Sequence, residues 1–186
     1  VGLLRRRLAL AGENDLRAVH DLARALERTG AWEESLGLLK AATSRNTDGL
    51  SHEQAAAHAL CSAQCADLMI ERGQAGEAEE LALSALSAID GLGLHEGSAL
   101  LYRSVGLAQL QATDYQAALD SFETALEHAR ALEDERTVGR LMNSIAVVHS
   151  RTGRYREALA ALESNLELAH RLNDLLGKSS SLNNIG

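Results

Sequence analysis

Apolar residues recur along the chain at spacings of three and four, which is the period of an α-helix. The clearest stripe runs over 155–172 and consists of Tyr155, Ala158, Leu159, Leu162, Leu166, Ala169 and Leu172. A second stripe, over 136–153, precedes it and ends at Gly153, and glycine suits the left-handed conformation that closes many helices. Because so few residues separate the two stripes, they predict a pair of antiparallel helices.

This pair of stripes is repeated. Residues 114–134 and 154–174 align without a gap at an offset of 40, and nine of the 21 positions are identical. Short breaks recur at Gly30, Gly73, Thr113 and Gly153, which are 43, 40 and 40 residues apart. Trp32, Tyr115 and Tyr155 each follow a break by two residues. A fixed period of this length predicts stacked units in which each pair packs only on its neighbours.

The repeat and the stripes together predict ten helices, with a longer surface loop over 44–52. Their expected bounds are 1–11, 14–29, 32–46, 52–72, 75–91, 94–111, 115–132, 135–151, 155–172 and 175–186. Within this register, Ala118 and Ala158 are expected where two helices cross, and Leu182 and Ile185 are expected to lie bare at one end.

Composition supports an all-helical chain. Of the 186 residues, 34 are Leu and 32 are Ala, both strong helix formers, and there is no proline to interrupt a helix. The few aromatic residues disfavour a ring-lined cofactor pocket, so we expect no cofactor. No apolar run is long enough to cross a membrane. With 26 acidic against 18 basic residues and a net charge of −8, the chain is a poor match for nucleic acid.

Candidate chemical groups are better explained by packing or solvation. Cys61 and Cys65 lie four residues apart on an inward stripe, which favours buried thiols over a metal pair. The arginine run 5–7 is typical of a solvated helix face. His149 occupies an inward position, as a packed or capping residue, and the Gly-Leu-Gly of 91–93 is expected to be a turn.

No catalytic constellation is visible either. The seven histidines form no HExxH or similar cluster, and there is no nucleophile elbow, phosphate-binding loop or dinucleotide fingerprint. Acidic pairs such as Glu33–Glu34 and Glu79–Glu80 occur at helix-surface spacing. We therefore expect no enzyme, no catalytic residue and no metal site.

A helix pair in which a bulky residue opens the second helix, followed by Ala, then Phe or Leu, then Ala-Leu, resembles the tetratricopeptide repeat (TPR). The first helix of that pattern carries a small residue in its middle, matched here by Val105-Gly106, Ile145-Ala146 and Ile185-Gly186. The sequence departs from the 34-residue form, because its period is 40 and the usual proline is missing. It is similar to the 40-residue subclass of LGN/Pins-type adaptors, kinesin light chains and bacterial TPR regulators.

The resemblance implies an all-α, right-handed superhelical solenoid of antiparallel helix pairs. Its first helices line a concave groove that binds a partner, and small residues let neighbouring helices approach closely. Transferred by helical phase onto this sequence, the groove residues are Arg17, His20, Asp21, Arg24, Gln64, Asp67, Arg103, Ser104, Leu107, Arg140, Asn143, Ser144, Val147, Asn183 and Asn184. Asn suits an extended peptide backbone, and Arg suits carboxylates.

Three functions remain open at this point. The first is a scaffold that binds a protein or peptide segment, with acidic groups toward the Arg/Asn half of the groove. The second is a sensory module of a bacterial signalling protein that controls an attached output domain. The third is a self-association module acting through the ends of the solenoid, which would make a homo-oligomer. A cytoplasmic location is expected for all three.

We expect one TPR domain belonging to a longer chain. Its expected units are 1–13 as the tail of a preceding repeat, repeats at 14–50, 51–93, 94–134 and 135–174, and a further first helix at 175–186.

Overall fold

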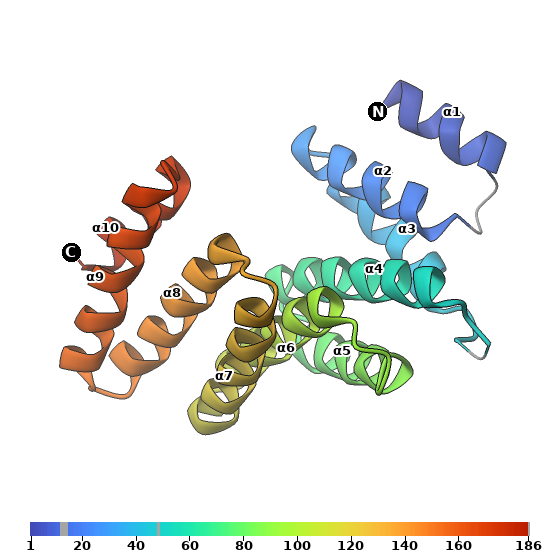
Figure 1. The fold of residues 1–186 in the computed structure, drawn as a ribbon. Helices are drawn as coiled ribbons and strands as arrows, with labels where there is room; N and C mark the ends of the chain where they lie inside the picture. Colours follow the sequence, from blue (N-terminus) through green and yellow to red (C-terminus); the bar gives the residue numbers. More distant parts are fainter. Residues whose placement is uncertain (12–14, 48, 186) are drawn as a thin grey trace.

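The computed structural model describes residues 1–11, 15–47 and 49–185, and these residues form ten α-helices and no strand (Figure 1). They are α1 (Gly2–Ala11), α2 (Leu16–Arg28), α3 (Trp32–Thr43), α4 (His52–Glu71), α5 (Ala75–Ala88), α6 (His95–Gln111), α7 (Tyr115–Ala131), α8 (Glu135–Arg151), α9 (Tyr155–Arg171) and α10 (Leu175–Ile185). We call α2, α4, α6, α8 and α10 the first helices and α3, α5, α7 and α9 the second helices. The all-α prediction is confirmed.

The helices follow one another along a curved row in chain order, with α1 at one end and α10 at the other (Figure 1). In the part of the chain that the structure describes, helices contact only helices one or two places away in sequence. Each pair therefore meets only its neighbours, as the 43-40-40 register predicts. The expected surface loop follows α3, and position 14, where one helix was expected to begin, lies outside the described residues.

Two predicted helices end earlier than expected. The helix predicted over 32–46 ends at Thr43, whose hydroxyl donates to the Leu39 carbonyl 3.0 Å away. The helix predicted over 75–91 ends at Ala88, because Gly91 and Gly93 adopt positive φ angles of 71° and 67° in the turn that follows. Residues 91–93 thus form the expected turn.

All four breaks have the same backbone geometry. Gly30, Gly73 and Gly153 have φ angles of 79°, 77° and 76°, and Thr113 has 63°. After each break the next N–H donates to a carbonyl five residues back, as from Asp114 to Gln109 at 2.9 Å. This is the Schellman closure of a helix. The repeat therefore places a residue in the left-handed backbone conformation at each of the four breaks.

We expect Thr113→Gly to raise the free energy of unfolding by about 1 kcal/mol, because a β-branched residue is strained at positive φ. The reciprocal change, Gly153→Thr, should lower it by a similar amount through backbone strain, since a Cβ added there meets no heavy atom within 4 Å. Urea unfolding of both variants measures the two effects. A loss of stability in Thr113→Gly would contradict this explanation.

The Asp that ends each Leu-x-Asp segment caps the helix that follows. Asp134 accepts from the Thr137 N–H at 3.1 Å, and Asp174 accepts from the Gly177 N–H at 3.1 Å. The residues before them, Glu133 and Asn173, both have a φ of 53°. An aspartate at this position satisfies a free N–H of the first turn, so it both ends one repeat and starts the next.

The core consists mainly of Ala and Leu. Phe122 of α7 is the largest fully buried side chain, and a Cβ added to Gly106 of α6 would lie 2.6 Å from its ring. Ala146 is also buried. The prediction that a small residue allows close helix approach is confirmed at Gly106. Gly186 and the side chain of Ile185 lie outside the described residues.

Ala118 and Ala158 are both buried, with 0% and 5% of their surface exposed. However, Ala158 also lines a cavity of about 590 Å³ together with Tyr155 and Leu159. We expect Ala118→Leu to lower the free energy of unfolding by about 1–3 kcal/mol through overpacking. The same change at Ala158 should cost clearly less, because the longer side chain can enter the cavity. Urea unfolding of the two variants compares them, and equal losses would contradict this expectation.

The two cysteines are free and buried in α4. Burial raises the pKa of Cys61 to about 12 and that of Cys65 to about 11, which keeps both thiols protonated. The Cys61 thiol donates to the Leu16 carbonyl at 3.3 Å. The prediction that both thiols are buried is confirmed.

Four histidines share one electrostatic feature. Burial lowers the pKa of His20, His58, His128 and His149. Below their ordinary value of about 6.5, the unfolded chain takes up protons more readily than the folded chain. We therefore expect the free energy of unfolding to fall as the pH drops from about 7.5 to about 5.5. In His58→Gln the fall should be smaller, and an equal fall would contradict this assignment.

Candidate binding groove

Polar side chains connect successive first helices. The Gln64 amide of α4 donates to the Glu27 carboxylate of α2, and Arg103 of α6 is paired with Asp67 of α4. Between α8 and α10, the Asn143 amide donates to the Ser180 hydroxyl at 2.9 Å. We call these contacts the first-helix ladder.

The ladder is interrupted once. In the part of the chain that the structure describes, no hydrogen bond or ion pair joins α6 to α8. The second helix α7 holds these two first helices together, and Phe122, Ala125 and Leu141 lie in the apolar cluster that it forms. The polar contacts that tie the other first helices together are thus replaced here by an open space.

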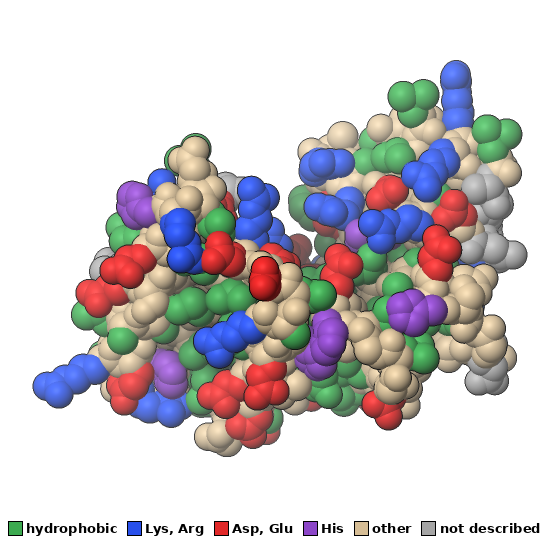
Figure 2. All heavy atoms as spheres, viewed as in Figure 1, with side chains coloured by type: hydrophobic (Ala, Val, Ile, Leu, Met, Phe, Trp, Pro, Cys, Tyr) green, Lys and Arg blue, Asp and Glu red, His purple; other side chains and the backbone are tan. Residues whose placement is uncertain are grey.

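A cavity of about 240 Å³ lies at this interruption. It is lined by Arg24 of α2, by Glu96 and Leu100 of α6, and by Arg136 and Arg140 of α8. Because side chains of three different first helices face one cavity, this face of the first helices is the concave side of the row. Figure 2 shows the surface hollowed between its two lobes, with basic side chains on both sides.

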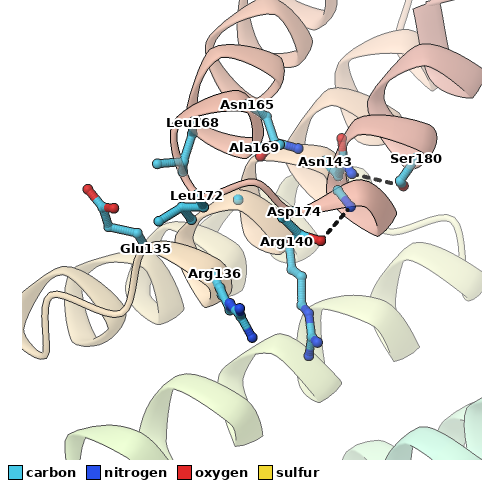
Figure 3. Close-up of a pocket in the computed structure, with 12 residues that line it drawn as sticks. Glu135, Arg136, Arg140, Asn143, Asn165, Leu168, Ala169, Leu172, Asp174 and Ser180 are labelled. Atoms are coloured by element: carbon cyan, nitrogen blue, oxygen red, sulfur yellow. Dashed lines mark hydrogen bonds between the residues drawn. The ribbon is translucent and has the colours of Figure 1, made fainter.

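A second cavity, of about 320 Å³, lies on the other side of α8 (Figure 3). It is formed by the start of α8, the end of α9 and the start of α10. Asn165 is buried and donates to Ser181 at 2.9 Å. Figure 3 shows Arg136 and Arg140 extending together, away from α9 and α10. The two arginine side chains therefore lie between the two cavities, and both line each of them.

The expected groove residues differ in how available they are. Arg17, Arg24, Arg140, Asn183 and Asn184 are exposed. Half-buried positions are His20, Asp21, Gln64, Asp67, Arg103, Leu107, Asn143, Ser144 and Val147.

Several of the half-buried residues are already engaged by neighbours. Asp21 is paired with Arg7 at 3.3 Å, and Ser144 donates to the Arg140 carbonyl at 3.2 Å. Leu107 packs against the apolar core. These residues form part of the groove wall, and their side chains are already occupied by contacts within the chain.

One expected groove residue is corrected by the structure. Ser104 is fully buried, and its hydroxyl donates to the Asp67 carboxylate at 2.8 Å. It packs between α4 and α6 instead of facing the groove, because the small side chain lies under the Arg103–Asp67 pair. Arg103 itself has only 18% of its side chain exposed.

Sequence reasoning missed Arg136 and Glu96. Arg136 precedes Arg140 by one helical turn, so extending the groove row by four residues toward the start of α8 would have found it. Glu96 lies at the start of α6, and only the curvature of the row brings it to the cavity beside Arg24. No sequence signal marks that approach.

The described residues contain neither a metal-binding cluster nor a helix suited to cross a membrane. Among the described residues, no three His, Cys, Asp or Glu side chains are arranged to hold a metal ion. Of the described helices, none combines the length and apolar character that crossing a membrane requires.

Comparison with known proteins supports the repeat. A sequence model described as the tetratricopeptide repeat matches residues 141–176, from within α8 to the start of α10. The chain has the tetratricopeptide-repeat fold. No curated protein sequence matches it.

Solved structures extend this TPR fold over nearly the whole chain. A signal transduction ATPase with a tetratricopeptide repeat sensor, from Pyrococcus horikoshii, matches with a TM-score of 0.75 and 17% identity over 96% of this chain. BtubC from P. vanneervenii matches with a TM-score of 0.73 and 18% identity over 99% of this chain and 76% of its own. TPR-like repeats of a kinesin light chain from Podospora anserina match with a TM-score of 0.65 and 18% identity over 93% of this chain and 84% of theirs.

The chain spans 27% of the length of the Pyrococcus protein, so the comparison concerns the repeat region and not the whole ATPase. TPR proteins are in general non-catalytic scaffolds for protein interaction.

Proposed function

We propose that this TPR chain is a protein-binding scaffold whose concave groove holds an extended or helical segment of a partner protein. The observation that supports the proposal most is the interruption of the first-helix ladder. There the groove contains a cavity, and exposed arginines of α2 and α8 face it. A partner segment with acidic side chains supplies the groups that this part of the groove lacks.

The proposal includes the division into repeats at 14–50, 51–93, 94–134 and 135–174, a right-handed superhelix and a cytoplasmic setting. The helix bounds agree with this division, since each repeat would contain one first and one second helix. Free, buried thiols agree with a reducing compartment.

Selection from a displayed library of random peptides tests the scaffold function. Peptides that bind the wild-type chain are resynthesised with a photoreactive residue, cross-linked and mapped by mass spectrometry. We expect cross-links on exposed groove residues such as Arg17, Arg140 and Asn184. An Arg156→Glu variant on the surface of α9 serves as the control and should bind unchanged. Cross-links confined to second helices, or no recovered peptide, would contradict the scaffold function.

A second candidate function is a sensory module that controls an attached output domain. It is favoured by the Pyrococcus structure, whose name describes its repeat region as a sensor. The sequence that flanks this chain in its parent protein distinguishes the two functions, because a sensor requires an output domain on the same chain.

Self-association is a third candidate. Leu3 of α1 and Leu182 of α10 have 82% and 57% of their surface exposed, at opposite ends of the row. Such exposed apolar side chains favour contact with a second copy. Sedimentation equilibrium tests this, and a monomer at high concentration would contradict it. The side chain of Ile185, also expected to lie bare, is outside the described residues.

A further inference from the structure

The cavity between α6 and α8 contains arginines without partners. Arg24, Arg136 and Arg140 form no ion pair or hydrogen bond through their side chains within the described part of the chain, although all three line the same cavity. Two other arginines that reach a neighbouring helix are paired, Arg103 with Asp67 and Arg171 with Glu135. Three unpaired guanidinium groups therefore line one cavity, at the place where the ladder is interrupted.

The carboxylates in the cavity do not balance these charges. Asp134 is already engaged, because it accepts from both the N–H and the hydroxyl of Thr137. Glu96 is the other acidic residue in the lining, and it forms no ion pair with the arginines in the described structure. Three positive charges thus face two carboxylates, of which one is occupied. This is a local basic site in a chain whose net charge is −8.

We propose that Arg24, Arg136 and Arg140 form one binding site for adjacent acidic side chains of the partner segment, and that the bound carboxylates link α2 to α8 across the groove. This inference rests on the scaffold function proposed above and names the chemistry that its groove recognises.

Carboxylates fit this cavity better than a phosphate group. The guanidinium fork binds the two oxygens of a carboxylate. Glu96 repels a dianion more strongly than a singly charged carboxylate. The cavity also has apolar walls, formed by Ala99, Leu100, Ala129 and Leu132, and these can contact the methylene groups of a glutamate side chain.

The position of the site gives the ligand a second effect. Because no hydrogen bond or ion pair joins α6 to α8 among the described residues, the described parts of 1–131 and 135–185 are connected mainly through the apolar packing of α7. A ligand held by Arg24 on one side and by Arg136 and Arg140 on the other adds a direct connection. Occupancy of the groove should therefore restrict the angle between these two parts of the row.

A binding measurement tests the chemistry. The probe is a fluorescein-labelled octapeptide in which glutamate and leucine alternate, and its counterpart contains glutamine in place of glutamate. Fluorescence anisotropy should show binding of the glutamate peptide at least about tenfold tighter than that of the glutamine peptide. The triple variant Arg24→Gln, Arg136→Gln, Arg140→Gln should lose this preference.

A matched control carries the same change of charge outside the groove. Arg6, Arg130 and Arg156 are exposed on α1, α7 and α9, and their triple glutamine variant should keep the preference within about twofold. Inorganic phosphate at millimolar concentration should not displace the glutamate peptide. Displacement by phosphate, equal binding of the two peptides, or equal losses in both triple variants would overturn the carboxylate site.

A distance measurement tests whether the bound peptide links α2 to α8 across the groove. Lys40→Cys and Ser164→Cys place spin labels on exposed positions of α3 and α9, and the native thiols are buried and protonated. The distribution of distances between the labels should narrow when the glutamate peptide binds, and it should stay broad in the groove variant. An unchanged distribution on a saturated protein would overturn the link.

These outcomes separate the site from the scaffold function. Selected peptides that cross-link to the groove but bind the groove variant as tightly as the wild type would remove the three-arginine site and leave the scaffold intact. Peptides that never reach the groove would remove both.

Discussion

Phe122→Ala should lower the free energy of unfolding by about 3–5 kcal/mol. Phe122 is fully buried in α7 and belongs to the cluster that also contains Ala118 and Leu141. Removing the ring deletes its transfer free energy and leaves a cavity that rigid neighbouring helices fill only in part. Urea unfolding followed by circular dichroism measures the loss.

The place of Phe122 in the row makes a further effect testable. In a linear array, each unit is stabilised by its own contacts and by those with its neighbours. Phe122 lies beside the α6–α8 junction, where, among the described residues, no hydrogen bond or ion pair joins α6 directly to α8. We therefore expect the unfolding transition of Phe122→Ala to broaden or split. Tyr155→Ala is the matched control, because the Tyr155 side chain is 70% exposed and its removal should cost far less. Similar losses in the two variants would contradict a core role for Phe122.

Local sequence signals were sufficient for the fold. The stripes at spacings of three and four mark the buried face of each helix, and the breaks mark left-handed residues that stop it. Both signals act within one or two helical turns, so no knowledge of distant contacts is needed. Helix ends at Thr43 and Ala88 were misplaced because the residues that follow can continue a helix by propensity, while turn geometry and capping end it.

The groove was only partly predictable, for two physical reasons. Helical phase places a residue on a face but does not say whether a neighbour already binds it, which is why Ser104 was misplaced and why Arg103 offers little free surface. The meeting of Arg24 with Arg136 and Arg140 depends on the curvature accumulated over several units. Small rotations between neighbouring pairs determine it, and these arise from packing details that a sequence pattern does not contain.

A second large effect is expected where α6 and α7 cross. In Gly106→Leu the first added carbon would lie 2.6 Å from the Phe122 ring, closer than real Cβ atoms approach other heavy atoms. Since the ring is fully buried and cannot move into solvent, the helices must separate. Overpacking of this kind costs about 1–3 kcal/mol and occasionally more, and four added carbons place this variant at the upper end. Urea unfolding of the single variant measures this loss.

Combining Phe122→Ala with Gly106→Leu provides the stricter test, because the two substitutions change the side-chain volume at this contact in opposite directions. Phe122→Ala leaves empty volume at the point where Gly106→Leu adds side-chain atoms. The double variant exchanges a large and a small residue across one contact and should be more stable than the sum of the single losses predicts, by about 2 kcal/mol. Gly139→Ala combined with Phe122→Ala is the control for additivity, since a Cβ on Gly139 would meet Asn165 instead of Phe122. If the Gly106 pair were as additive as the Gly139 pair, the two residues would not share the contact that sets the spacing of α6 and α7.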